Sequence, residues 1–386
     1  MNGKHMFSRT QPPVRSLRSA ASLATIALLT SACGAGAQND EADRTAVVID
    51  EERCRTNSEL GTLTYITGYH YQASVTQLEV IAADALGFFD AVCLDIEIQP
   101  GNGDVMGNAQ LVSAGTAHFT PTSNEAEILQ ANVRDHEILG VATYGHVPIS
   151  SLITGPDVED LTELEGATIG HQSMLPAPLE AMLEAADVDI DSIEQVEAGY
   201  DPSVLPRDQV QALTGFRSNE PHQLDAMDEE YVEWLPEDFG VVGSFGVMAT
   251  NPEWAEENPT AVEDFLRAVA HAFDHCQEHG EECVGHAEEL DEAGYDTEHN
   301  LKVWDTEREL AEASTPDDMP RGYIDLSMTE AEAQTVIDSG ELDELPDLEP
   351  MFDPRYLESV YVATEVVWRS EDEDEGEGEG EEESKE

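Results

Sequence analysis

Four polar and aromatic side chains stand together where a strand-like run meets a helix-like one. The stretch LTYITGYHYQASVTQLEVIAADALGFFD, residues 63–90, places Tyr69, His70, Tyr71 and Gln72 at this junction. Tyrosine faces can stack on a flat ring, while a phenol, an imidazole and an amide can form directed hydrogen bonds with its edge. These four residues are therefore candidate ligand-binding residues. The alternative is a surface loop whose tyrosines pack on neighbouring helices.

The elements that would position this junction alternate in type. Between about residue 60 and residue 300, short β-branched runs alternate with longer helical patterns, which predicts an α/β fold with largely parallel sheets. A helix is expected over 73–89, directly after the aromatic residues, and a long amphipathic helix from about Thr260. Strands are expected at 63–67, 94–100, 118–122, 137–144, 148–155, 167–170, 193–199, 211–216 and 239–250.

The charge of the chain restricts its partners. Its 386 residues include 83 acidic and 17 basic side chains, a net charge of −66, of which the tail at 371–386 supplies −10 and the rest −56. Such a surface repels nucleic acid and anionic lipid headgroups, so nucleic acid is not expected as a partner. Salt at about 1 M shortens the Debye length to about 3 Å. We therefore favour a halophilic protein over an acidic protein from an ordinary habitat.

The N-terminus has the pattern of an export signal. Residues 1–33 contain basic side chains followed by the apolar run AASLATIALLTSAC, which ends at Cys33. A basic region, a short apolar region and small residues before the cysteine predict a lipoprotein signal peptide, with Cys33 as the acylated residue. The chain would then be lipid-anchored on the extracytoplasmic face of the cell membrane. The alternative is an ordinary secretory signal with an incidental cysteine. The acidic stretch 34–59 reads as a tether.

Four further cysteines suit an oxidising compartment. Cys54, Cys93, Cys276 and Cys283 allow three disulfide pairings. The stretch HCQEHGEEC places Cys276 and Cys283 on either side of a glycine-containing turn, so we expect that pair first and Cys54 with Cys93 second. A metal site with the nearby histidines His275, His279 and His286 is the alternative, but the spacing fits no regular zinc pattern. No metal and no cofactor are expected.

The succession of segments resembles the substrate-binding proteins of ABC importers. The segments that carry this resemblance, over roughly residues 62–280, are the aromatic loop, ALGFFDA, LDIEIQPG, LVSAGTAHF, GYDPSVLPRDQVQALTGFRSNEPHQLDAM and NPEWAEENPTAVEDFLRA. The chain is most similar to the branch that serves nitrate, sulfonate, taurine and thiamine-pyrimidine precursors, which shares its fold with the thiamine-pyrimidine synthases. No single motif is diagnostic, so the resemblance rests on the ordered set.

The resemblance implies a bilobed periplasmic-binding-protein fold of type II. Two α/β lobes would be joined by two crossover segments, near VPISSLIT and GVVGSFGVMAT. Lobe one would comprise residues 60–150 and 246–300, and lobe two residues 151–245. A helical C-terminal region, residues 301–369, would pack on lobe one, and residues 370–386 would form a disordered acidic tail. Hinge closure would hold a ligand between the lobes.

The same resemblance places further loops in the cleft, at the carboxyl ends of strands. Ser123, Asn124 and Glu125 lie where the family's lobe-one loop meets its ligand, although they would also suffice as a helix cap. Asn219 and Glu220 match a segment that returns from lobe two, with a turn and cap before Pro221 as the alternative. The loop before a lobe-two helix adds two more candidate ligand-binding residues, Gln172 and Ser173.

Basic side chains are too few for a fully anionic ligand. Residues 60–150 contain only Arg134, and residues 151–245 contain only Arg207 and Arg217. Because a desolvated anion needs paired donors, a neutral or weakly cationic heteroaromatic compound is expected, such as a thiamine-pyrimidine precursor. A carboxylate such as that of Glu125 or Glu220 could accept a hydrogen bond from a ring amine. A sulfonate, nitrate or taurine binder remains the alternative within the family.

The sequence therefore predicts a monomeric solute receptor that delivers its ligand to an ABC permease and ATPase. A pyrimidine-forming or pyrimidine-degrading enzyme is the rival from another class. The cysteine-rich iron-associated motif of the thiamine-pyrimidine synthases has no counterpart here, and no nucleophile elbow or phosphate-binding loop is recognisable. We therefore expect no catalysis. A surface scaffold whose cleft has lost its ligand is a third reading.

Overall fold

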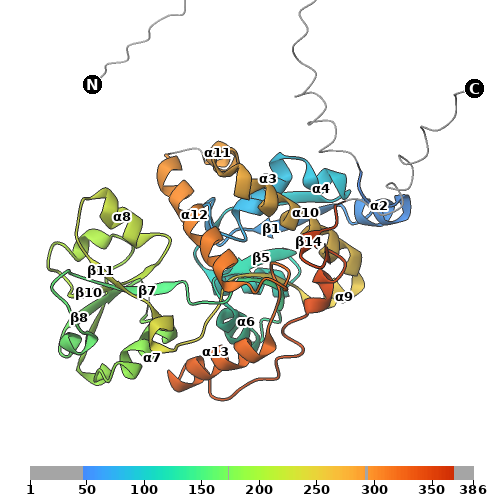
Figure 1. The fold of residues 1–386 in the computed structure, drawn as a ribbon. Helices are drawn as coiled ribbons and strands as arrows, with labels where there is room; N and C mark the ends of the chain where they lie inside the picture. The colour runs from blue at the N-terminus through green and yellow to red at the C-terminus, as the bar shows by residue number, and fades with distance from the viewer. Residues whose placement is uncertain (1–46, 173, 292–293, 369–386) are drawn as a thin grey trace, which may run out of the picture. The chain divides into compact units, whose positions relative to one another are not determined.

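The computed structural model describes residues 47–172, 174–291 and 294–368, and they all belong to one compact unit, Glu41–Glu386. The predicted signal peptide with Cys33, the first part of the tether, Ser173 and the tail at 370–386 lie outside the described residues. Figure 1 shows two groups of helices and strands, each built around its own sheet. We call these groups lobe one, which contains β1, and lobe two, which contains β7.

The sheet of lobe one has five strands in the order β3-β1-β5-β12-β6. Strand β1 pairs in parallel with β3 and β5, whereas β12 runs antiparallel to β5 and β6. The last strand to join this sheet comes from much later in the chain than the other four. These strands are β1 (Thr62–Ile66), β3 (Asp95–Gln99), β5 (Phe119–Thr122), β6 (Leu139–Gly145) and β12 (Phe245–Thr250).

Lobe two has a second five-stranded sheet, in the order β11-β7-β10-β8-β9. Strand β8 is parallel to β9 and β10, while β7 is antiparallel to β10 and β11. The chain passes between the two sheets at 146–149 and again at 240–244. These strands are β7 (Ser150–Thr154), β8 (Thr168–His171), β9 (Glu194–Glu197), β10 (Ala212–Phe216) and β11 (Val232–Trp234).

Helices bury the apolar residues of both sheets. In lobe one, Tyr65, Phe89, Phe119 and Phe265 lie in one cluster with α3 and the long helix α10. The rings of Phe119 and Phe265 are stacked, with centroids 3.8 Å apart. The lobe-one helices before β6 are α2 (Glu51–Ser58), α3 (Leu78–Ala85), α4 (Phe88–Ala91), α5 (Val105–Ser113) and α6 (Glu125–Val133). Those after β12 are α9 (Pro252–Glu257), α10 (Pro259–Glu278) and α11 (Gly280–Leu290).

Lobe two has a smaller core, in which Leu152, Leu161, Ile169 and Leu179 are buried together. Its helices are α7 (Ala177–Ala185) and α8 (Glu220–Ala226). Short 3₁₀ helices complete this part of the chain at η1 (Leu161–Leu164), η2 (Ile190–Ser192), η3 (Pro202–Val204) and η4 (Pro236–Phe239).

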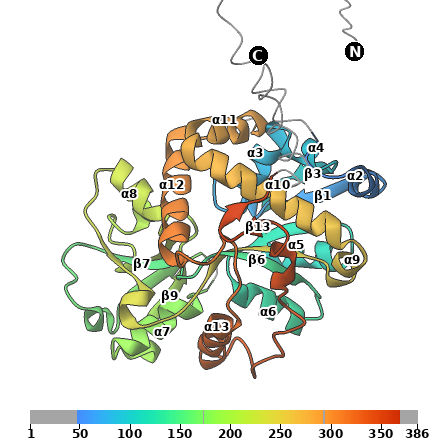
Figure 2. The ribbon, with the colours of Figure 1, turned by 45° about the vertical axis from the view of Figure 1, so that its right-hand side comes forward.

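The C-terminal part of the described chain returns across both lobes. Figures 1 and 2 show α12 between the helices of lobe one and those of lobe two, and α13 below α6. Trp304 of α12 is fully buried, and its indole nitrogen donates to the carbonyl oxygen of Cys276, so α12 is fixed on α10 of lobe one. The elements are α12 (Thr297–Ser314), α13 (Leu326–Asp338), η5 (Pro354–Leu357) and the hairpin β13 (Tyr361–Val362) and β14 (Glu365–Val366).

The helix expected over 73–89 is shorter and is broken. Helix α3 begins only at Leu78, and Gly87, with φ 76°, separates it from α4. The residues before α3 are held by tertiary hydrogen bonds instead, because the backbone N–H of Ala73 donates to Asn300 and that of Val75 donates to Glu307. Thr76 has a φ of 74°, a left-handed conformation that a β-branched residue rarely adopts.

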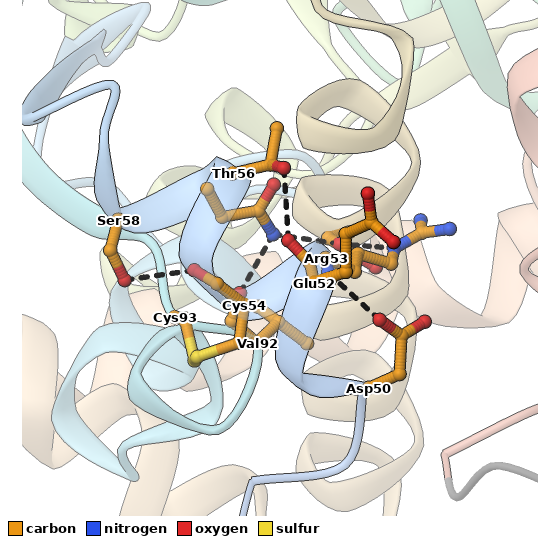
Figure 3. The surroundings of a disulfide bond; sticks show 10 residues. Asp50, Glu52, Arg53, Cys54, Thr56, Ser58, Val92 and Cys93 are labelled. Carbon is orange, nitrogen blue, oxygen red and sulfur yellow. Dashed lines mark hydrogen bonds and ion pairs between the residues drawn. A yellow bond between two sulfur atoms is a disulfide. The ribbon is translucent and has the colours of Figure 1, made fainter.

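Two disulfide bonds fasten helices of lobe one. Cys54 of α2 is bonded to Cys93, and Cys276 of α10 is bonded to Cys283 of α11. Figure 3 shows the first bond beside the side chain of Arg53, which pairs with Asp264 of α10 at 2.6 Å. Helix α2 is therefore attached to lobe one both covalently and by a partly buried ion pair. Both thiols of the HCQEHGEEC stretch are used in the second disulfide.

Candidate functional site

A cavity of about 460 Å³ lies between the two lobes and α12. Lobe one contributes the aromatic loop, residues 74–77 and residues 121–123, while lobe two contributes Tyr200, Phe216 and residues 218–219. The third wall comes from the segment 294–307, at the start of α12. The cavity therefore draws on three parts of the chain that are far apart in sequence.

The aromatic loop forms a short strand rather than an open loop. Strand β2 (Tyr69–His70) pairs antiparallel with β4 (Gly101–Asn102). The side-chain oxygen of Gln77 accepts hydrogen bonds from the backbone N–H groups of Gly68, at 2.8 Å, and Tyr69, at 3.2 Å. His70 has a φ of 44° and lines the cavity together with Thr76. Unusual backbone conformations of this kind cluster at binding sites, where the surrounding structure holds them.

Two tyrosines face each other across the cavity. The rings of Tyr69, from lobe one, and Tyr200, from lobe two, are 6.2 Å apart between centroids and 29° from parallel. Their exposed fractions are 45% and 58%, so both side chains remain about half accessible to solvent. A flat ring sandwiched between two aromatic faces needs about 7 Å between them, twice the usual contact distance of about 3.5 Å. A small movement of one lobe would admit a planar ligand between these rings.

Six of the predicted ligand-binding residues line the cavity. They are Tyr69, His70, Tyr71, Gln72, Ser123 and Asn219. Tyr71 is partly buried against the lobe-one core, and its carbonyl oxygen accepts a hydrogen bond from the hydroxyl of Tyr295. The side-chain oxygen of Asn219 lies 2.8 Å from Nε2 of His299. The structure thus brings together the aromatic loop and one residue from each of the loops at 123 and 219.

Asn124 and Glu125 do not line the cavity, for a local reason. The side chain of Asn124 caps α6 by accepting from the backbone N–H of Glu127 at 3.0 Å. Glu125 is 2% exposed, and its carboxylate accepts a hydrogen bond from the hydroxyl of Thr143. Asn124 is therefore a helix cap, as the alternative interpretation had it. The carboxylate of Glu125 is hydrogen-bonded within lobe one.

Gln172 and Glu220 also lie behind the cavity wall. Glu220 is fully buried and accepts hydrogen bonds from the backbone N–H of Phe216, at 2.7 Å, and from the side chain of Asn219, at 3.1 Å. Gln172 exchanges hydrogen bonds with Thr214 and donates to Glu220. Burial raises the pKa of Glu220, opposed by these hydrogen bonds. Both side chains hold the loop that presents Asn219, rather than facing the cavity themselves.

Several cavity residues were not anticipated from the sequence. Tyr200 lies in the GYDPSV segment, whose position just after an expected strand was the available signal. No local sequence pattern indicated that residues of α12 line the cavity, because their position depends on how the C-terminal region folds back onto the lobes. Other cavity residues that were missed include Phe216, Phe245, Tyr295, His299, Asn300 and Glu307.

The charge of the cavity is one-sided. None of the described residues that line it is a lysine or an arginine, whereas Asp291, Asp296 and Glu307 contribute carboxylates. Asp296 caps α12 by accepting from the backbone N–H of His299. Burial raises the pKa of Glu307 to about 7, opposed by hydrogen bonds from Ser218 and Val75. The cavity therefore offers flat apolar faces and hydrogen-bond acceptors, and its described lining holds no lysine or arginine.

The described residues contain neither a candidate metal site nor a candidate membrane-spanning helix. No group of three or more His, Cys, Asp or Glu side chains among them could hold a metal ion. Within the same residues, no helix is both long enough and apolar enough to cross a membrane.

Comparison with solved structures defines the fold. The periplasmic aliphatic sulphonate binding protein SsuA from Escherichia coli is similar, with a TM-score of 0.58 and 10% identity over 79% of this chain and 96% of that chain. A sulfonate-binding protein from Methylobacillus flagellatus KT has a TM-score of 0.56 and 13% identity over 77% and 92%. The desulfurization enzyme DSZB has a TM-score of 0.53 and 15% identity over 77% and 97%. The predicted bilobed periplasmic-binding-protein fold is confirmed.

The family follows from the sequence match. The NMT1/THI5-like family model matches residues 76–283, more than half of the chain, so the protein belongs to the NMT1/THI5-like family. This confirms the resemblance on which the bilobed fold was predicted. No curated protein matches the chain.

Proposed function

We propose that the protein is a solute receptor that captures a small heteroaromatic nutrient between its lobes and delivers it to an ABC importer. A thiamine-pyrimidine precursor is the favoured ligand class. The two lobes, residues 60–150 with 246–300 and residues 151–245, would close around the ligand by rotation about the segments 146–149 and 240–244. The ligand would favour the closed state, because Tyr69 and Tyr200 can contact it together only there.

The composition of the cavity is the observation on which this proposal rests. Tyr69, Tyr200 and Phe216 supply aromatic surface, and the described lining contains no lysine or arginine. A sulfonate or nitrate buried there would lose its hydration without gaining a lysine or arginine partner, which is costly. A neutral or cationic ring gains stacking and hydrogen bonds to the acceptors around it. The cavity thus supports a heteroaromatic ligand over the sulfonate, nitrate or taurine alternative, although two neighbours in fold are named as sulfonate binders.

The cellular setting follows from the N-terminal sequence. We infer that residues 1–33 are a lipoprotein signal and that Cys33 carries the acyl anchor, which holds a monomeric receptor on the extracytoplasmic face of the membrane. An ABC permease and its ATPase would be the partners. The pairing of Cys54, Cys93, Cys276 and Cys283 is consistent with an oxidising compartment.

An enzyme remains the rival, because DSZB shares the fold. The four cysteines of the described chain are all in disulfides, so none of them offers a free thiol for nucleophilic or iron chemistry. Assays of the purified protein with added Fe(II) and a candidate pyrimidine test this reading. Turnover would establish an enzyme, whereas saturable binding without product formation supports the receptor.

Thermal unfolding in concentrated salt tests the ligand class. At about a hundred times its dissociation constant, a hydroxymethylpyrimidine compound should stabilise the protein by roughly 2.7 kcal/mol. Taurine and nitrate at the same concentration should leave the unfolding temperature unchanged. Stabilisation by taurine or nitrate, without stabilisation by the pyrimidine, would contradict the proposal.

A further inference from the structure

One carboxyl group lies where the three walls of the cavity meet. Glu307 of α12 is 7% exposed and lines the cavity. One of its oxygens accepts a hydrogen bond from the backbone N–H of Val75, in lobe one, at 2.8 Å. The other accepts from the hydroxyl of Ser218, in lobe two, at 2.7 Å. The carboxyl group is therefore fixed in position by both lobes, and α12 itself is fixed on lobe one through Trp304.

The partners of Glu307 in the structure are neutral. Ser218 and the backbone of Val75 can donate hydrogen bonds, but neither carries a positive charge. Another buried carboxyl group, that of Glu79 on α3, interacts electrostatically with Glu307. Burial raises the pKa of Glu79 to about 8, and the charge of Glu307 raises it further. A buried carboxylate without a cation is costly, so the group must take up a proton or meet a positive charge.

Arg308, His299 and His222, which lie on or against α12 beside Glu307, do not supply this charge. Arg308, the next residue of α12, forms ion pairs with Asp305, Glu309 and Glu312. Burial lowers the pKa of His299, also on α12, and that of His222 on α8, so both imidazoles favour the neutral form. Glu307 raises the pKa of Glu79, and His222 lies 2.8 Å from Thr306, the residue before Glu307. The other titratable groups that line the cavity are His70, Asp291, Asp296, His299, Tyr69, Tyr71, Tyr200 and Tyr295.

We infer that Glu307 determines ligand specificity, by selecting ring compounds that present a positive charge or a protonated nitrogen to its carboxylate. The inference rests on the proposed receptor function and narrows its ligand class to cationic aromatic or heteroaromatic compounds. The walls suit such a ligand, because the faces of Tyr69 and Tyr200 attract a cation as well as stacking on a ring. The ligand would supply the countercharge that the protein itself does not.

This arrangement couples ligand binding to proton release. Below about pH 7 the empty cavity holds Glu307 protonated, because burial raises its pKa to about 7. A cationic ligand binds the carboxylate and therefore displaces that proton. Its affinity should rise by up to about tenfold per pH unit below pH 7 and level off above it. A neutral ring of the same shape should show no such dependence.

The experiment is a calorimetric titration of the full chain in concentrated KCl with three probes of one shape. Benzylammonium is cationic, benzyl alcohol is neutral and benzenesulfonate is anionic. We expect benzylammonium to bind at least about tenfold more tightly than benzyl alcohol, with benzenesulfonate not binding, because one neutralised buried charge corresponds to ~1.4 kcal/mol or more. At about pH 6 the heat of benzylammonium binding should depend on the ionisation enthalpy of the buffer, since a proton is released.

Two variants assign this preference to the carboxyl group. Glu307→Gln keeps both hydrogen bonds, because the amide oxygen can accept from Val75 and the amide NH₂ can donate to the hydroxyl of Ser218. It should reduce the preference for benzylammonium to near unity and abolish proton release. The matched control is Glu309→Gln, which removes the same charge from the same helix at an exposed position, 70% accessible, on another face. It should change neither quantity.

The outcomes separate this inference from the receptor function. An unchanged preference in Glu307→Gln, a preference for benzenesulfonate, or no binding of benzylammonium would each overturn the role of Glu307. If the pyrimidine still stabilised the protein in that case, the receptor function would stand without it. If benzylammonium bound through Glu307 but no pyrimidine bound, the role of Glu307 would stand and the pyrimidine assignment would fall.

Discussion

The candidate site is built from a few side chains held in unusual local conformations. Tyr69 lies on a two-residue strand, and its neighbour His70 adopts a positive φ. Gln77 secures the same loop by accepting two backbone hydrogen bonds. Opposite them, Tyr200 of lobe two is 58% exposed. The rigid face of lobe one thus meets a more exposed ring from lobe two.

The exposed ring gives a prediction for binding. Tyr200→Ala should raise the dissociation constant of a bound heteroaromatic ligand by about tenfold, because loss of ring stacking costs ~1.4 kcal/mol. Unfolding of the empty protein should hardly change, since the ring is mostly exposed. Titration calorimetry of the variant measures the first effect. Met227→Ala removes another exposed apolar side chain of lobe two, one outside the cavity, and serves as the control. Equal affinities for wild type and Tyr200→Ala would contradict the stacking role.

Buried carboxyl groups give a prediction for pH. Burial raises the pKa of Glu79 to about 8, well above its ordinary value of 4.5. The folded state therefore binds this proton more tightly than the unfolded state, and the corresponding stability is fully present below pH 4.5 and lost as the pH rises through about 8. Burial also raises the pKa of Glu332 to about 8, so this group contributes to the pH dependence of stability with the same sign.

The measurement is the free energy of unfolding from about pH 5 to about pH 9 in concentrated salt, for wild type and Glu79→Gln. The wild type should lose stability across this range, by at most ~1.4 kcal/mol per pH unit for each such group. Glu79→Gln should lose less, because it removes one of the titrating groups. Parallel curves for the two proteins would show that Glu79 does not contribute.

At the scale of elements, α12 changes how the cleft must be understood. A two-lobed receptor needs only its lobes to enclose a ligand, but here a helix from the C-terminal region forms the third wall. Its side chains bond to lobe one at Ala73 and Val75 and to lobe two at Ser218. His222 of α8 lies 2.8 Å from the hydroxyl of Thr306. In the structure lobe two contacts α12 at these residues, so a closure of the proposed kind would dock lobe two onto α12 as well as onto lobe one.

Helix α2 gives a prediction for stability. The Cys54–Cys93 bond closes a loop of sequence separation 39, for which loop-closure entropy predicts a stabilisation of roughly 4 kcal/mol. A Cys54→Ala, Cys93→Ala double variant should unfold at a lower denaturant concentration by a corresponding amount. Its ligand affinity should not change, because neither residue lies at the cavity. Unchanged stability in the double variant would show that Arg53 and its neighbours hold α2 without the disulfide.

The strands and most helices could be predicted because their signals are local. Alternating and β-branched runs located β1, β5, β7 and β10 within a few residues. The helix expected over 73–89 was wrong in its first turns, since Thr76 adopts a left-handed φ of 74° that interrupts a helix, and contacts with α12 hold the backbone of Ala73 and Val75. Asn124 illustrates the same limit, because a residue that caps a helix and one that binds a ligand look alike in sequence. Glu307 could not be found, since its role depends on a contact between segments about 230 residues apart, of the kind that local patterns cannot encode.

At the scale of the whole molecule, the acidic surface dominates. A net charge of −66 opposes the compact state through self-repulsion unless salt screens it. The midpoint of urea unfolding should rise steeply between about 0.2 M and about 3 M KCl, over which the Debye length falls to a few ångströms. Sucrose of equal osmolality is the control, because it favours the folded state without screening charge. A midpoint independent of KCl would contradict a halophilic adaptation.

The proposed receptor function requires that the cleft bind a flat heteroaromatic compound and not a sulfonate. Calorimetric titration of the full chain in concentrated KCl, with a hydroxymethylpyrimidine compound and with taurine, tests it most directly. We predict saturable one-to-one binding of the pyrimidine, weakened by Tyr200→Ala, and no heat with taurine. Saturable binding of taurine, with no heat from the pyrimidine, would contradict the account.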